Sequence, residues 1–169
     1  MNKKRKLLFS VSIGLNILLV AIVAWGIMRM NFVKEQVVLT EVQTNLVKLE
    51  GLIAYQVGDN WSEPNLVTTK LSDVLNGIWL GMTIGEQLET LSKGDKKILE
   101  NLYFKLKQYP NDELYSFPNL TEEDKQNFKD LQGILREVGL GLNITIESNM
   151  NYFMSQAEAL SKKIESPLN

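Results

Sequence analysis

The chain has 169 residues, with 18 Lys and Arg, 20 Asp and Glu, and neither His nor Cys. Without cysteine it has no disulfide, thiol nucleophile or zinc–thiolate site. Without histidine it has no Ser-His-Asp or Cys-His nucleophile and no imidazole metal ligand. The composition therefore excludes most of the familiar catalytic groups, and we expect a protein that is not an enzyme and holds no cofactor.

The charge is unevenly distributed along the chain. Residues 1–29 carry five basic side chains and no acidic one, and the remaining 140 residues carry 13 basic and 20 acidic side chains. A nucleic-acid-binding protein needs a clustered basic surface to replace phosphate counterions. The acidic body therefore argues against nucleic acid as a partner, and also against binding to anionic lipid by charge alone.

The N-terminus has the pattern of a membrane anchor. A basic cytoplasmic tail, residues 1–6, precedes residues 7–28, which begin at Leu7 and contain no ionisable group. About 20 apolar residues, at about 1.5 Å each, span a bilayer core of about 30 Å. Trp25 lies near the far end, where an indole prefers the interface. Because more basic residues precede this span than follow it, we predict a cytoplasmic N-terminus and an extracytoplasmic body.

Two alternatives concern this segment. The first is a cleaved secretory signal, whose apolar core usually has about 7–15 residues and ends in small residues. The span of residues 7–28 fits this pattern poorly. Cleavage would leave a secreted helical bundle. Within the span, Ser10 and Gly14 form a small-xxx-small pair and Asn16 is polar, so one face could contact another membrane helix. The ordinary composition of a single span explains the same residues.

Residues 31–169 show apolar seams spaced alternately by three and four residues, which is typical of helices. These seams include Leu46, Leu49, Ile53, Leu71, Ile78, Leu99, Leu102, Leu106, Phe128, Leu131, Leu135 and Phe153. We therefore expect an all-α chain whose body is an antiparallel, four-helix-bundle-like extracytoplasmic domain. Helices are predicted over about 31–57, 63–92, 95–109 and 121–165, with a loop over 110–120. The Thr121–Asp124 sequence resembles a capping box at the start of the last helix, and Gly139 and Gly141 could kink that helix near its middle.

A stripe of glycines marks the second predicted helix. Gly77, Gly81 and Gly85 are four residues apart, beside Trp79 and Met82. Each glycine inside a helix costs about 1 kcal/mol relative to alanine, so three on one stripe suggest a purpose. The stripe indicates either close packing of another helix, with Gly139 and Gly141 facing it, or a groove for a small apolar or amphipathic ligand.

Two features near the predicted loop could form contacts. Tyr115 and Phe117 lie between two prolines, and aromatic loop residues often mark a contact surface, although they could equally cover the open end of the bundle.

The nearby acidic residues lack the spacing of a calcium-binding loop, and helix capping explains three of them, so we predict no metal site. These acidic residues are Asp112, Glu113, Glu122, Glu123 and Asp124.

These observations favour a single-pass membrane protein with a non-catalytic helical body, which acts as an interaction or sensory accessory of an envelope process. The bias toward Lys over Arg and the many Asn residues suggest an AT-rich bacterial genome. The expected partners are the lipid bilayer and a membrane or envelope protein, and a second copy of the chain is an alternative partner.

Overall fold

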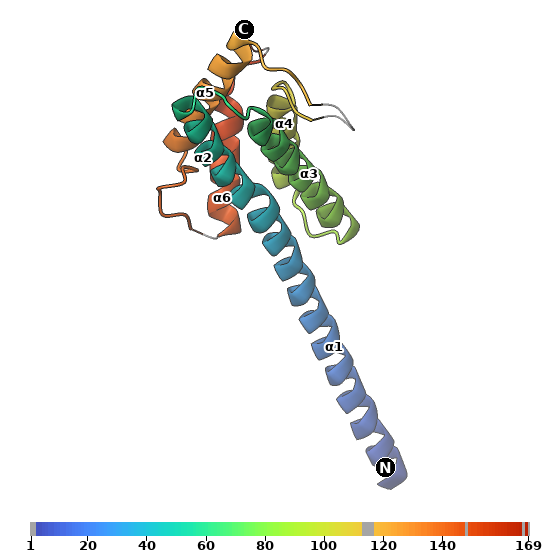
Figure 1. Cartoon of the computed structure of the whole chain (residues 1–169). Helices are drawn as coiled ribbons and strands as arrows, with labels where there is room; N and C mark the ends of the chain where they lie inside the picture. Colours follow the sequence, from blue (N-terminus) through green and yellow to red (C-terminus); the bar gives the residue numbers. More distant parts are fainter. Residues whose placement is uncertain (1–2, 113–116, 148, 167, 169) are drawn as a thin grey trace. The chain divides into compact units, whose positions relative to one another are not determined.

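A computed structural model of the chain describes residues 3–112, 117–147, 149–166 and 168, with the side chain of residue 34 left out. Every regular element in these residues is helical, and none is a strand, which confirms the predicted all-α chain. By internal contacts the chain divides into two compact units, Met1–Val33 and Lys34–Asn169. The elements, shown in Figure 1, are α1 (Lys3–Val37), the π-helix η1 (Val38–Gln43), α2 (Thr44–Gly58), α3 (Asn65–Gln87), α4 (Lys93–Leu106), α5 (Glu122–Glu137) and α6 (Met150–Lys163).

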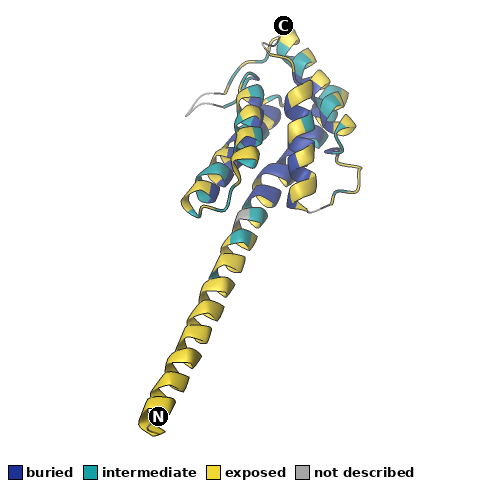
Figure 2. Ribbon diagram, turned by 180° about the vertical axis from the view of Figure 1, so that it is seen from behind, coloured by how far each residue is buried: buried dark blue, intermediate teal, exposed yellow. Residues whose placement is uncertain are grey.

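The first unit is helical throughout its described part. Its most apolar stretch has a mean hydropathy of 2.6 and none of its residues is buried, as the yellow ribbon of Figure 2 also shows. By length and composition this helix can cross a membrane. The elements α1, η1 and α2 follow one another without a break, so the apolar segment belongs to a helix that runs from Lys3 to Gly58.

The second unit is built around one hydrophobic core. Helix α2 packs against α3 and α5, α4 packs against α3 and α6, and η1 packs against α3 and α6. Figure 2 shows the buried residues on the inward faces of these helices. The largest fully buried side chains are Leu46, Leu49, Ile53, Leu71, Ile78, Leu99, Leu102, Leu106, Phe128, Leu131, Leu135 and Phe153, all of which belong to predicted seams.

Three helices end in the same way, with a residue of positive φ just past the helix. These residues are Asn60 (φ 50°), Glu89 (φ 52°) and Gly139 (φ 82°). In each case the next residue donates its backbone N–H to a carbonyl five residues earlier, which is the bond of a Schellman cap. The three bonds are Trp61 N to Gln56 O (2.7 Å), Thr90 N to Gly85 O (3.0 Å) and Leu140 N to Leu135 O (2.8 Å).

Side chains cap the starts of α4 and α5. The Thr121 hydroxyl accepts from the backbone N–H of Asp124, whose carboxylate accepts from the Thr121 N–H, so the predicted capping box is present. Ser92 caps α4 by accepting from the N–H of Asp95. Helix α4 therefore begins at Lys93, two residues before the predicted start, and α3 stops at Gln87, because the Glu89 turn ends it.

The single helix predicted over 121–165 is instead two helices, α5 and α6, joined by residues 138–149. Gly139 does more than kink the helix: its positive φ and the Schellman bond of Leu140 terminate α5. A new start is then defined at Asn149, whose side chain accepts from the N–H of Tyr152. The prediction joined the two helices because the apolar residues of α6 continue the helical spacing of α5. Met150 and Phe153 are buried in the same core as the apolar residues of α5.

Candidate functional site

The glycine stripe of α3 lies against other parts of the same chain. A Cβ built on Gly77 would lie 2.5 Å from the Glu41 carbonyl oxygen, and one on Gly81 would lie 2.9 Å from Val38 Cγ2. A Cβ on Gly85 would lie 2.7 Å from Leu91 Cβ. The first two glycines thus let the backbone of η1 approach α3 closely, and the stripe is covered by the chain's own residues.

The other residues predicted beside this stripe are dispersed. Trp79 is exposed, and Met82 is partly buried against the core. A Cβ on Gly139 would contact Gln156 and Tyr152, and one on Gly141 would contact Ile144 and Arg136. The structure therefore does not bring the two groups of glycines together.

The predicted contact residues elsewhere are exposed where they are described. Phe117 is exposed, and Tyr115 lies outside the described residues. In the N-terminal unit, Leu7, Ser10, Gly14 and Trp25 are exposed, and the Arg29 guanidinium lies 5.3 Å from the Trp25 ring centroid.

The predicted contact face of the span needs a correction. Asn16 donates from Nδ2 to the Ser12 carbonyl oxygen over 2.8 Å. At 100° per residue, Gly14 and Asn16 are about 200° apart around the helix. The Ser10–Gly14 pair and Asn16 therefore lie on different faces.

Glu50 of α2 is a buried charged side chain, with 1% of its residue surface exposed. One carboxylate oxygen accepts from Gln132 Nε2 (3.1 Å) and from Arg136 Nε of α5, and the other accepts from the backbone N–H of Leu142 over 2.8 Å. Burial, the largest single influence, raises the pKa of Glu50, but these hydrogen bonds together lower it. Glu50 therefore stays ionised and joins α2 to α5 and to residues 138–149.

A second polar group holds both ends of the same loop, at Val138 and Gly139 and at Glu147. Gln43 of η1 donates from Nε2 to Gln156 Oε1 (3.1 Å) and to the Glu147 carbonyl oxygen (3.2 Å). Gln156 in turn donates to the carbonyl oxygens of Val138 (3.1 Å) and Gly139 (3.0 Å). The loop is thus fixed to the core at both ends by side chains that are almost fully buried.

This loop presents apolar side chains to solvent. Leu142 is 56% exposed and Ile144 is 42% exposed. Two shallow depressions flank them, of about 360 Å³ and 220 Å³. We call this region the Leu142 surface; its residues are Lys48, Gly51, Leu52, Lys70, Arg136, Gly141, Leu142, Asn143 and Ile144.

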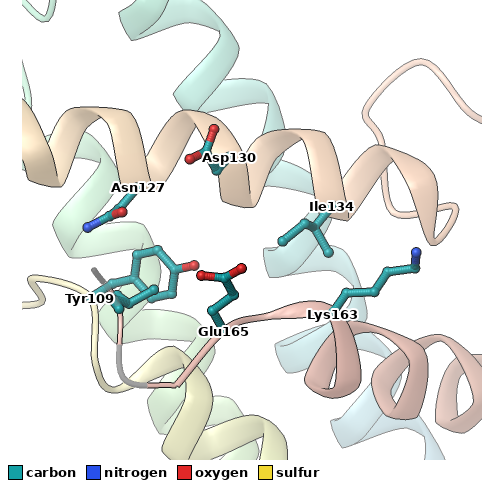
Figure 3. A pocket seen from close by; sticks show the side chains of 7 residues that line it. Tyr109, Asn127, Asp130, Ile134, Lys163 and Glu165 are labelled. Carbon is teal, nitrogen blue, oxygen red and sulfur yellow. The ribbon is translucent and has the colours of Figure 1, made fainter.

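A separate polar cavity of about 310 Å³ lies between the end of α4, α5 and the segment after α6 (Figure 3). In Figure 3 the Tyr109 hydroxyl points toward the Glu165 carboxylate, with Asp130 above it on α5. Burial of Tyr109, together with the charges of Asp130 and Glu165, raises the pKa of its hydroxyl, which therefore stays protonated. The cavity is also lined by Asn127, Ile134, Lys163 and Leu168, and Lys163 pairs with Glu137 over 2.7 Å.

Three of the five acidic residues near the 110–120 loop, Asp112, Glu122 and Asp124, have structural partners, and Glu113 lies outside the described residues. Asp112 accepts hydrogen bonds from the hydroxyls of Thr68 and Thr69 on α3, and Asp124 caps α5. Within the part of the chain that the structure describes, no group of three or more His, Cys, Asp or Glu side chains is arranged to hold a metal ion.

The loop residues of the Leu142 surface, residues 141–144, were missed by the sequence prediction, which placed them inside a helix. A signal was available: Gly139, Gly141 and the β-branched run Ile144-Thr145-Ile146 all disfavour helix, and Asn149 is a good N-cap. The partners of Glu50 and Tyr109 had no such signal, because they come from distant parts of the chain.

Comparison with known proteins gives no match: no family model fits the sequence, and no curated protein or solved structure is significantly similar to the chain.

Proposed function

We propose that the chain is a single-pass membrane protein whose helical body lies outside the cytoplasm and binds an envelope protein, without catalysis of its own. The body would be the antiparallel, bundle-like domain expected from the sequence. The N-terminal helix would anchor it, with residues 1–6 in the cytoplasm. The arrangement of the helices, the orientation of the span and the envelope partner are all part of this proposal.

One observation carries the proposal. The apolar segment and the first core helix of the body are parts of one helix, from Lys3 to Gly58, whose N-terminal part is entirely exposed. An exposed apolar stretch of this length is unfavourable in water, and the bilayer core is the environment that removes this cost. The direction of insertion follows from the four basic residues at positions 3–6.

The Leu142 surface is the partner site that we favour. Burying Glu50 removes a carboxylate from water, and three hydrogen-bond donors offset that cost. Two of them belong to α5, and the third, the Leu142 N–H, reaches Glu50 only while the loop keeps its conformation at Leu142. The loop thus holds Leu142 and Ile144 in fixed positions, where apolar side chains at an interface contribute binding energy. The basic residues Lys48, Lys70 and Arg136 line this surface, but Lys70 pairs with Asp73 over 2.6 Å and Arg136 pairs with Glu50. The surface therefore favours a partner that binds mainly through an apolar centre, with a weaker contribution from an acidic edge.

Protease treatment of intact protoplasts tests the anchor and its orientation. A full-length, membrane-bound protein whose C-terminal tag is digested from outside supports the proposal. A protected tag would mean the opposite orientation, and a shortened protein free in the medium would mean that the span is a cleaved signal.

Co-purification with paired variants tests the partner site. Ile144→Asp places a carboxylate among the basic residues of the Leu142 surface and should reduce recovery of the partner. Leu66→Asp is the control, since Leu66 is 41% exposed, close to the 42% of Ile144, and lies on α3 outside this surface. Equal recovery with both variants, or no partner in several growth states, would contradict the proposed site.

The polar cavity at Tyr109 favours a second candidate function, the sensing of a small cationic ligand. Its volume lies at the lower limit of small-molecule sites, and the Glu165 carboxylate lies beside a protonated hydroxyl there, with the negative charge of Asp130 nearby. A thermal-shift screen of amines on the full-length protein should then show a stabilising compound, and Asp130→Asn should weaken that shift. The ligand groove expected along the glycine stripe has less support, because Val38, Glu41 and Leu91 occupy it.

A further inference from the structure

The polar side chain of Asn16 lies near the middle of the apolar segment. It is nine residues after Leu7 and twelve before residue 28, so about 14 Å and 18 Å of helix separate it from the two ends. An asparagine side chain has two N–H donors and an oxygen with two lone pairs. The bond from Nδ2 to the Ser12 carbonyl uses one donor and leaves the oxygen's capacity unused.

In a bilayer, this remaining capacity needs a partner. The hydrocarbon core holds no water to complete the hydrogen bonds of the amide, and the side chain is too short to reach the headgroups from this depth. Polar side chains of this kind form hydrogen bonds between membrane helices. A second helix beside Asn16 is therefore the arrangement that satisfies the amide.

The surface next to Asn16 is open and shallow, with room for another helix. A depression of about 390 Å³ extends over Ser12, and its lining includes Leu8, Leu15, Asn16 and Leu19. The small Ser12 side chain lets another backbone come close. Asn16 also belongs to a heptad seam, spaced alternately by three and four residues, which is the pattern of a left-handed helix pair. That seam consists of Phe9, Ser12, Asn16, Leu19, Val23 and Gly26.

We propose that two copies of this chain pair in the membrane along this seam, with the two Asn16 amides hydrogen-bonded to each other. The inference rests on the proposed membrane anchor. Copies inserted in the same direction place Asn16 at the same depth, and each amide can donate an N–H to the oxygen of the other. This self-complementarity of one surface patch is what a twofold-symmetric pair requires.

The net negative charge of the two bodies opposes this pairing only weakly. Exposed charges separated by more than about 10 Å are largely screened at 0.1 M salt. The pairing in the membrane therefore does not require the bodies to contact each other.

The absence of cysteine from the sequence allows a direct test by disulfide crosslinking in native membranes. Ser12→Cys in the full-length protein places a thiol on the proposed seam. Ser10→Cys is the matched control, because it makes the same chemical change two residues earlier, about 200° around the helix. We expect an oxidant to give a homodimer with Ser12→Cys and little with Ser10→Cys. Adding Asn16→Leu to Ser12→Cys should weaken the pairing about 3- to 30-fold, the range for hydrogen bonds between membrane helices.

Alkaline extraction of the same membranes separates failure of the pairing from failure of the anchor. A protein that stays in the membrane but crosslinks equally at both positions, or equally with and without Asn16→Leu, would overturn the pairing and leave the anchor standing. A crosslink from Ser12→Cys to a protein of another mass would replace the second copy with a different membrane helix. A protein extracted into the soluble fraction would overturn both proposals.

Discussion

Glu50 combines nearly complete burial with a full set of hydrogen-bond donors. Its oxygens accept from the side chains of Gln132 and Arg136 and from the Leu142 N–H. Glu50→Gln keeps the volume but replaces one acceptor oxygen by an NH₂ donor, which faces at least one existing donor. Because Arg136 is half exposed and can be rehydrated, we expect a loss of about 1.5–3 kcal/mol in the free energy of unfolding at pH 7, measurable by urea denaturation.

The same residue predicts a pH dependence. The pKa of Glu50 lies below its ordinary value of 4.5 in the folded protein. Its stabilising contribution is therefore complete above the unfolded pKa and is lost as the pH falls through the folded pKa. The stability difference between wild type and Glu50→Gln should shrink below about pH 4.5. Glu63→Gln, at an exposed position, is the control; a difference that stays constant from pH 7 to 3 would contradict this account.

Gly77 and Gly133 form a matched pair of helical glycines. A Cβ at Gly77 would meet backbone atoms of Glu41, which cannot move as the end of a flexible side chain can, whereas one at Gly133 has nothing within 4 Å. We expect Gly77→Ala to destabilise the body by about 1–3 kcal/mol through overpacking, against a gain in helix propensity of about 1 kcal/mol. Gly133→Ala should raise stability by about 0.5–1 kcal/mol. Thermal melts of both variants would show the opposite signs, and equal effects would mean that η1 can move away from α3.

The C-terminal ends of three helices are set by single residues with positive φ. Glu89 occupies the left-handed position of a Schellman cap that elsewhere in this chain is taken by Asn60 and Gly139. A side chain other than Gly or Asn costs about 1 kcal/mol there. Glu89→Gly removes an exposed side chain and should stabilise the protein by roughly that amount. Gly139→Ala should destabilise it. Chemical denaturation decides this, and a loss of stability in Glu89→Gly would point to an unrecognised role of its carboxylate.

The same comparison explains how far the sequence could predict the fold. Periodic apolar residues identify helices because burial follows the helical repeat, and the seams from Leu46 to Ile53 and from Leu99 to Leu106 are buried as predicted. The break after α5 was missed because the apolar spacing resumes in register at Met150. The Leu142 surface was missed with it, since it depends on bonds from Glu50 that join residues about 90 positions apart.

At the scale of the whole molecule, the proposed membrane orientation rests on very few residues. The basic side chains at positions 3–6 are the strongest determinant of orientation in the sequence, because positive charge next to a span is retained on the cytoplasmic side. Replacing all four by Ser reverses this asymmetry, since Arg29 and Lys34 then carry the nearby positive side chains, at the opposite end of the span. We expect part of the population to insert in reverse, so that a C-terminal tag becomes protected from protease in intact protoplasts.

The control for this experiment removes the same number of positive charges from the body. Lys93, Lys97, Lys107 and Lys129 are all exposed and lie more than 60 residues after the span, so their replacement by Ser should leave the tag fully accessible. The two variants have the same net charge, and a difference between them therefore reports the position of the charge and not its amount. If neither variant changes the accessibility of the tag, the basic tail does not set the orientation, and folding of the body before insertion of the span becomes the better explanation.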